Sequence, residues 1–214
     1  SRGRTVASRR ERFVALMRLF SEPKMVRILL VALLLNFLHG VVTTFYPLFA
    51  LEAGLSLSEV AILKTAHSLT NTFARPVAGE PIRFLGADRA SYLSLALLAG
   101  LITILPSQNL FWVSFALMGA IGLMRAIVMV ANTVAMADLD ESRISRGTAS
   151  GFYHSSKDLG SLSSPAVCGW VASAAGLGTM LVATPIVAAA AFFGVTALSS
   201  RRSAVSMKTV TPAT

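Results

Sequence analysis

The sequence predicts an all-helical membrane protein with six transmembrane helices. Of its 214 residues, 54% are hydrophobic and only 14% are charged, whereas soluble proteins carry about 25% charged residues. The hydrophobic residues gather into six stretches of roughly the length that crosses a bilayer, about 20 residues. The cations behind the formal net charge of +9 lie between these stretches. They do not form the basic patch of a soluble nucleic-acid-binding protein, so we expect no nucleic acid partner.

We expect three parts along the chain: a basic cytoplasmic segment over 1–25, a transmembrane domain over 26–200 and a cytoplasmic tail over 201–214. The second span is unusually polar, and the fifth is rich in glycine, serine and alanine. The six expected spans run from about Val26 to Leu51, Ser58 to Leu85, Ser91 to Leu105, Leu110 to Ala137, Thr148 to Ala174 and Thr179 to Ser199.

The connections between the spans alternate in charge. Before the first span stand the cations Arg2, Arg4, Arg9, Arg10, Arg12, Arg18 and Lys24. After the second, fourth and sixth spans stand Arg83, Arg89, Arg143, Arg146, Arg201, Arg202 and Lys208. The other three connections contain no Lys or Arg. The positive-inside rule therefore places both termini in the cytoplasm, and we expect an integral protein of a bacterial cytoplasmic membrane.

The basic segment has a helical pattern of its own. Phe13, Leu16, Met17 and Phe20 recur at helical spacing among arginines, which is typical of an amphipathic helix on an anionic leaflet. The alternative is a basic flank that only fixes the orientation of the first span. Because the chain does not begin with methionine, we expect a fragment. The single cysteine, Cys168, is expected to be a small buried hydrophobic residue.

Ionisable and amide side chains occur in four of the six spans. The third and sixth spans contain no ionisable residue and can face lipid. The first, second, fourth and fifth carry Asn36, His39, Lys64, His67, Asn71, Arg75, Arg125, Asn132, His154, Lys157 and Asp158. Each ionisable residue inside a membrane costs on the order of 3 kcal/mol on insertion scales. We therefore expect these side chains to face one another or a water-filled cavity.

The order of the spans indicates an internal repeat. Spans one to three are mixed, very polar and apolar, and spans four to six repeat that order. Since each triplet has an odd number of spans, the second triplet is inverted relative to the first. This is the 3+3 inverted repeat found within six-helix halves of transporters.

Several motifs resemble the C-terminal half of the major facilitator superfamily of transporters. Phe45-Tyr46-Pro47-Leu48, followed by Ala53-Gly54-Leu55-Ser56, is similar to the family's seventh helix and the external turn after it. Ala74-Arg75-Pro76-Val77-Ala78-Gly79 resembles the end of the eighth. Arg146-Gly147-Thr148-Ala149-Ser150-Gly151, then Asp158-Leu159-Gly160 and Gly169, resembles the eleventh. The resemblance covers nearly the whole chain.

The resemblance implies a twelve-helix protein whose N-terminal six-helix half is absent from this chain. It also implies transport by alternating access, with helices 7, 8, 10 and 11 lining a central cavity and helices 9 and 12 peripheral. The candidate cytoplasmic gate, or loop motif, comprises Arg75, Gly79, Arg83 and Gly86. It departs from the family pattern, since Arg83 stands at the position of an aspartate and Asp88 lies where the family prefers a cation.

A cavity dominated by Lys and Arg favours a small anionic solute. The candidate substrate-binding residues are Asn36, His39, Lys64, His67, Asn71, Arg125, Met129, Asn132, His154 and Lys157. Arg125 is the first choice because a mid-membrane arginine is otherwise hard to justify. Alternatively, the cations pair with acids of the absent half. Arg75, beside Pro76, is expected to be structural.

His154 and Asp158 are one helical turn apart, a spacing that allows a titratable pair coupling proton movement to transport. The alternative is that Asp158 neutralises Lys157 or a cation of a neighbouring helix. The sequence shows no phosphate loop, metal cluster or nucleophile elbow, so we expect neither an enzyme nor a cofactor. The expected function is secondary active transport of a small organic solute, with lipid, solute and possible proton partners. Proton-linked drug efflux and a non-transporting sensor or assembly subunit are the alternatives.

Overall fold

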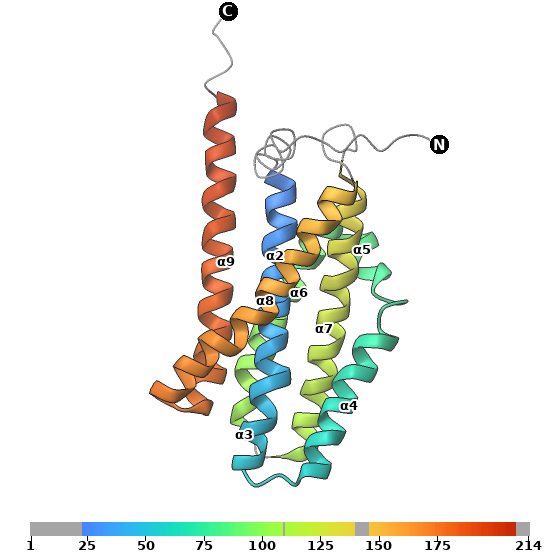
Figure 1. Ribbon diagram of the computed structural model, residues 1–214. Coiled ribbons are helices and arrows are strands. Elements are labelled where there is room, and N and C mark those ends of the chain that lie inside the picture. Colours follow the sequence, from blue (N-terminus) through green and yellow to red (C-terminus); the bar gives the residue numbers. More distant parts are fainter. Residues whose placement is uncertain (1–22, 109, 140–145, 209–214) are drawn as a thin grey trace, which may run out of the picture.

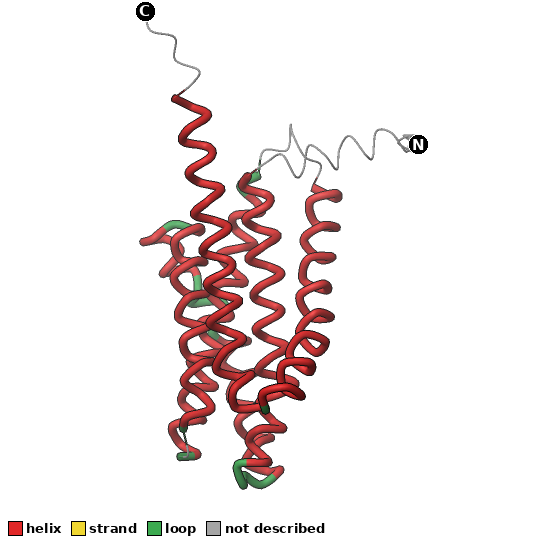
Figure 2. The backbone as a smooth tube through the Cα atoms, turned by 90° about the vertical axis from the view of Figure 1, so that its left-hand side faces the viewer, coloured by secondary structure: helices red, strands yellow, loops and turns green. Residues whose placement is uncertain are grey.

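A computed structural model describes residues 23–108, 110–139 and 146–208, and every regular element in that part of the chain is helical (Figures 1 and 2). The elements are α2 (Pro23–Gly40), η1 (Val41–Phe45), α3 (Tyr46–Glu52), α4 (Leu57–Phe73), α5 (Gly79–Leu85), α6 (Ala87–Ile104), η2 (Leu105–Ser107), α7 (Phe111–Ala137), α8 (Arg146–Ala175) and α9 (Leu177–Lys208). The all-helical prediction is confirmed. The expected surface helix around Phe13 to Phe20 lies outside the described residues.

Four helical rods are long and apolar enough to cross a membrane: Pro23–Glu52, Ala87–Ser107, Phe111–Ala137 and Leu177–Thr196. They correspond to the first, third, fourth and sixth expected spans. The two polar candidates differ from them in different ways, because α4 has only 17 residues, whereas α8 has 30 but is rich in polar residues. Contact of the chain with a lipid bilayer therefore follows from four helices, and membrane crossing by α4 and α8 stays a prediction.

The second expected span is not one continuous helix, so that prediction was wrong. Helix α4 ends at Phe73, turns occupy residues 74–78, and α5 begins at Gly79. The break contains Pro76, which has no N–H to donate and disfavours the helical conformation of the residue before it. The first span contains a second irregularity, the π-helical segment η1. It ends two residues before Pro47, which cannot donate a hydrogen bond to the carbonyl one turn back.

The long helices run along one axis and alternate in direction (Figures 1 and 2). Helix α8 packs against α2 and helix α4 against α7, while α6 lies behind, against α7 and α9. The core between them is aliphatic and includes Leu35, Leu63, Leu95 and Met118, each at most 1% exposed. The start of α2, the turn between α5 and α6, the end of α7 and the start of α8 therefore share one end of the bundle, which we call the cation-rich end, and the ends of α3, η2 and α8 share the other (Figure 1).

Glycines allow the close approach of the helices in two pairs, α2 with α8 and α4 with α7. A methyl group added at Gly160 of α8 would collide with the backbone carbonyl of Leu33 on α2. A methyl group at Gly122 of α7 would lie 2.5 Å from the carbonyl oxygen of His67 on α4. Small residues permit this kind of contact between membrane helices. Other glycines of α8 have open space around them, Gly147, Gly151 and Gly169.

Candidate functional site

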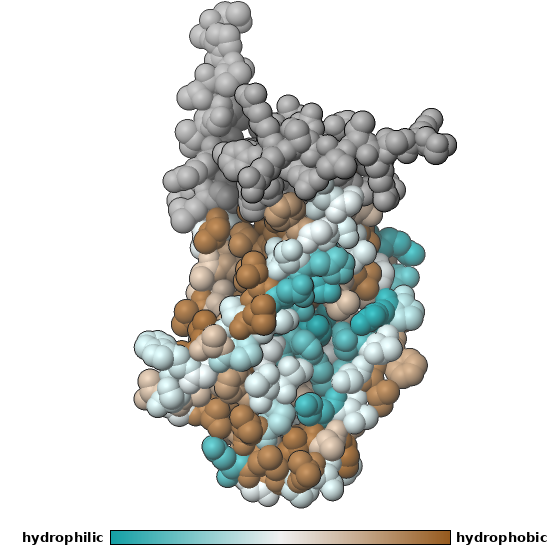
Figure 3. All heavy atoms as spheres, in the orientation of Figure 1, coloured by the Kyte–Doolittle hydropathy of each residue, from teal (hydrophilic) through white to brown (hydrophobic). Residues whose placement is uncertain are grey.

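Hydrophilic side chains gather in a band on one face of the bundle, between α8 and α4 (Figure 3). We call this band the polar face. The α4 side is formed by Lys64, Ser68 and Asn71, with Arg75 in the turn after the helix, and the α8 side by His154, Lys157, Asp158 and Ser161. On each helix these residues recur at spacings of three and four, so they share one side of it. The polar face thus joins two stripes that are far apart in the sequence.

Behind the polar face, three cationic or titratable side chains meet in the interior. The ring of His39 on α2 stacks on the ring of His67 on α4, with centroids 5.6 Å apart and planes inclined by 26°. Arg125 on α7 lines the same small cavity as both rings. His67 is 4% exposed and Arg125 is 9% exposed. We call His39, His67 and Arg125 the buried cluster.

Most nitrogen atoms of the buried cluster have no hydrogen-bond partner within the described residues. This applies to Nε and Nη1 of Arg125, to both ring nitrogens of His67 and to Nδ1 of His39. The backbone carbonyl of Met118 lies near His67 but does not complete a well-formed bond. Arg125 also forms no ion pair with any described residue. Since buried polar groups are normally satisfied, this cluster marks a place where another group or a conformational change must compensate.

The cavity at the buried cluster is small. Its volume is about 10 Å³, and its remaining walls are aliphatic side chains of α2, η1, α6 and α7. A space of that size holds about one water molecule. An organic solute does not fit there in this conformation. The predicted binding residues His39, His67 and Arg125 are therefore brought together, but behind the polar face and not on it.

The two buried asparagines make bonds that account for their position. The Asn36 side chain donates to the carbonyl of Ala32 in its own helix, at 2.8 Å. Asn132 on α7 donates to the carbonyl of Ile28 on α2, at 3.1 Å, and so links two helices. Met129 is half-buried and packs against the aliphatic core. These three residues were expected in the binding site, and the structure shows for each a role in packing or in bonding.

On the polar face, the charged residues of α8 are placed around Tyr153. The ammonium group of Lys157 lies 5.6 Å from the centre of the Tyr153 ring, and the His154 ring contacts the same ring edge-on at 5.7 Å. No hydrogen bond joins His154 to Asp158, and Asp158 forms no ion pair within the described residues. The proposed proton-coupling pair stays a prediction. The alternative contact of Asp158 with Lys157 is also not formed.

Tyr153 is the residue that the sequence interpretation missed. It is 8% exposed and lies near Thr133 and Asn132 of α7 and near Arg125. It thereby connects the charged side chains of the polar face to the buried cluster. A sequence signal was present, because Tyr153 precedes Lys157 by one helical turn.

The residues of the expected loop motif lie at the cation-rich end of the bundle. Arg75 is in the break after α4, and Gly79 begins α5. Arg83 forms an exposed ion pair with Glu80 at 3.7 Å and lies over the Phe84 ring at 5.4 Å. Gly86 has a φ of 80°, a backbone conformation that residues other than glycine rarely adopt. Arg83 therefore pairs with an acid of its own helix, whereas the resembled family has an aspartate at this position.

Comparison with known proteins does not assign the chain to a family. No protein-family model matches it, and no curated protein shows significant similarity to it. The function is therefore inferred from the arrangement of the polar face and the buried cluster.

Proposed function

We propose that this chain is the C-terminal half of a secondary active transporter of the major facilitator type, which moves a small organic anion by alternating access. One observation carries the proposal: exposed charged side chains of α4 and α8 share a single face of a bundle whose other long helices are apolar. Such side chains are too costly to face lipid. A water-filled cavity closed by a second six-helix half satisfies them.

The helix packing supports the proposed inverted repeat. The triplet α2, α4, α6 would correspond to the triplet α7, α8, α9, so the contact of α2 with α8 corresponds to that of α7 with α4. Both contacts are present and both are close. Gly40, in the first helix of one triplet, faces Ser164 of α8, and Gly122, in the first helix of the other, faces His67 of α4. In this proposal α4 and α8 both cross the membrane, which gives six spans.

The polar face and the buried cluster behind it suggest an order in which their residues contact the solute. Lys64 and Lys157 on the polar face are accessible, so they meet the anion first. Arg125 offers unpaired N–H groups suited to a carboxylate or phosphate oxygen, but it lies behind them in a cavity of about 10 Å³. A movement of α4 relative to α7 would open that cavity. Coupling of anion binding to helix movement is what alternating access requires.

Proton-linked efflux is a second candidate, and one observation favours it. Asp158 is exposed on the polar face and has no cationic partner among the described residues. A carboxylate in that position can accept a proton from a water-filled cavity. Replacing Asp158 by Asn would abolish proton-driven transport while leaving solute exchange in the absence of a proton gradient intact.

The test is transport by the complete protein in liposomes, using radiolabelled carboxylates and phosphate esters, with organic cations and neutral sugars for comparison. We expect anion uptake that falls about 10- to 100-fold in Arg125→Gln, because one or two charge-assisted hydrogen bonds are lost. Arg125→Lys, which keeps the charge, should retain part of it. If neither anions nor any other solute moved, or if Arg125→Gln transported as well as the unmodified protein, the assignment would be wrong.

A further inference from the structure

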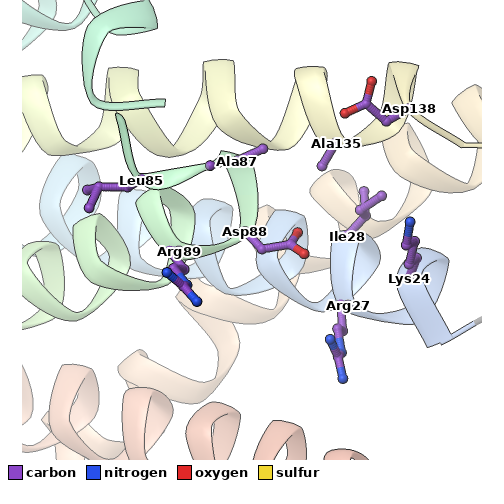
Figure 4. Close-up of a pocket in the computed structure, with 10 residues that line it drawn as sticks. Lys24, Arg27, Ile28, Leu85, Ala87, Asp88, Arg89, Ala135 and Asp138 are labelled. Carbon is purple, nitrogen blue, oxygen red and sulfur yellow. The ribbon is translucent and has the colours of Figure 1, made fainter. Parts of the chain in front are cut away.

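A second cavity lies at the cation-rich end of the bundle, away from the buried cluster. It has a volume of about 320 Å³ and is bounded by the start of α2, the turn between α5 and α6, and the end of α7. Figure 4 shows the side chains that line it, which come from these three places. A cavity of this size accommodates a ligand much larger than water. We call it the end pocket.

Among the described residues, the side chains that line the end pocket carry mixed charges, with three cations and two acids. The cations are Lys24, Arg27 and Arg89, and the acids are Asp88 and Asp138. Arg27 is half-buried and lies near the hydroxyl of Tyr92 on α6. Lys24 and Arg89 are exposed. A ligand with one negative charge would balance the charges of these described side chains.

The chemistry of these side chains fits a phosphodiester. Arginine matches phosphate oxygens with two parallel N–H donors, and lysine adds a compact charge. The two carboxylates of Asp88 and Asp138 can accept hydrogen bonds from hydroxyl groups next to the phosphate. Aliphatic side chains, Ile28 and Leu85 among them, form part of the wall. This combination of phosphate, hydroxyl and apolar contacts is that of a phospholipid headgroup with the start of its acyl chains.

We propose that the end pocket binds the headgroup of an anionic phospholipid, of the phosphatidylglycerol type, from the cytoplasmic leaflet. The leaflet assignment rests on the orientation in the proposed function, because cation-rich ends of membrane helices face the cytoplasm. Basic pockets between transmembrane helices at that side are suited to lipid headgroups. A bound headgroup would link the ends of α2, α6 and α7 and so stabilise the packing of helices that surround the buried cluster.

The experiment measures the melting temperature of the complete protein in micelles of detergent and phosphatidylcholine. We expect added phosphatidylglycerol to raise the melting temperature, because a ligand that binds only the folded state stabilises it. Glycerophosphoglycerol, which supplies the same phosphodiester headgroup without acyl chains, should leave the melting temperature unchanged at millimolar concentration. Arg89→Gln and, separately, Lys24→Gln should each lose most of the rise caused by the lipid.

Arg83→Gln is the matched control, because it removes one exposed cation from the neighbouring helix α5 but lies outside the end pocket. It should keep the full rise. An undiminished rise in both Arg89→Gln and Lys24→Gln would overturn the proposal, as would equal losses in Arg83→Gln. A rise with glycerophosphoglycerol equal to that with the lipid would mean a soluble phosphodiester ligand and would overturn the lipid assignment. The readout needs no transported solute, so failure of the transport proposal is distinguished from failure of this one.

Discussion

The front and the rear of the bundle use exposed side chains in opposite ways. On the front, the exposed residues of α4 and α8 include Lys64, His154 and Asp158. On the rear, the exposed residues of α6 include Leu97, 49% exposed, and on the side of the bundle those of α9 include Val187, 65% exposed. Both faces belong to helices of the same bundle with a common aliphatic core. The difference shows that exposure alone does not identify the lipid-facing surface, and that the type of exposed residue does.

The largest effect should follow from placing a charge on the rear. Leu97 lies near the middle of α6, and Leu97→Arg should lower the amount of folded protein in the membrane severely, since a central arginine costs about 3 kcal/mol. Ser161→Arg puts the same side chain near the middle of α8 on the polar face, beside Asp158, and should be tolerated. Quantitative blotting of membrane fractions checks both variants. Equal losses in the two variants would remove the distinction between front and rear.

A smaller effect is expected where helices of the front meet. Gly160→Ala inserts a methyl group against the α2 backbone and should cost about 1–3 kcal/mol through overpacking. Gly151→Ala, on the same helix, enters open space and should be neutral or stabilising by up to about 1 kcal/mol, the gain in helix propensity. Thermal unfolding in detergent compares them. A stability of Gly160→Ala at or above that of Gly151→Ala would contradict the close packing of α8 on α2.

The smallest effect concerns a single hydrogen bond between helices. Asn132→Ala removes the bond to Ile28 on α2, and such bonds in membrane proteins contribute about 0.6 kcal/mol on average and about 1.7 at most. Asn36→Ala is the control, because it removes an amide of the same size that bonds within its own helix. The melting temperature of Asn132→Ala should be the lower of the two. The reverse order would mean that Asn132 does not hold α7 to α2.

The sequence predicted local features well and relations between helices poorly. Hydrophobic runs located four of the six long helices to within four residues at each end, because length and polarity are local properties. Helix α9 continues to Lys208, nine residues beyond its expected end at Ser199. The break at Pro76 was noticed, but the residues on either side were assigned to one span. The π-helical segment before Pro47 was not foreseen, since no residue type specifies it uniquely.

Relations between helices depend on rotation and register, which one sequence does not reveal. Lys64 and His67 were assigned to the same stripe, yet the structure exposes Lys64 and buries His67 against His39. A difference of three residues on a helix is a rotation of about 60°, which is enough to separate the polar face from the interior. Asn132 was also expected to bind solute. Its side-chain amide instead donates a hydrogen bond to the backbone carbonyl of Ile28.

Cysteine accessibility tests the central claim, that the polar face lines water. In a Cys168→Ala background, Ser68→Cys and Ser161→Cys are compared with their neighbours Leu69→Cys and Leu162→Cys, whose side chains point about 100° away. All four positions are exposed in this chain. The thiolate is the nucleophile that attacks a charged, membrane-impermeant thiol reagent, and both the thiolate and the reagent require water. The account predicts rapid labelling at residues 68 and 161 and little at 69 and 162 in the complete protein in membranes; equal labelling at all four positions, or none at 68 and 161, would contradict it.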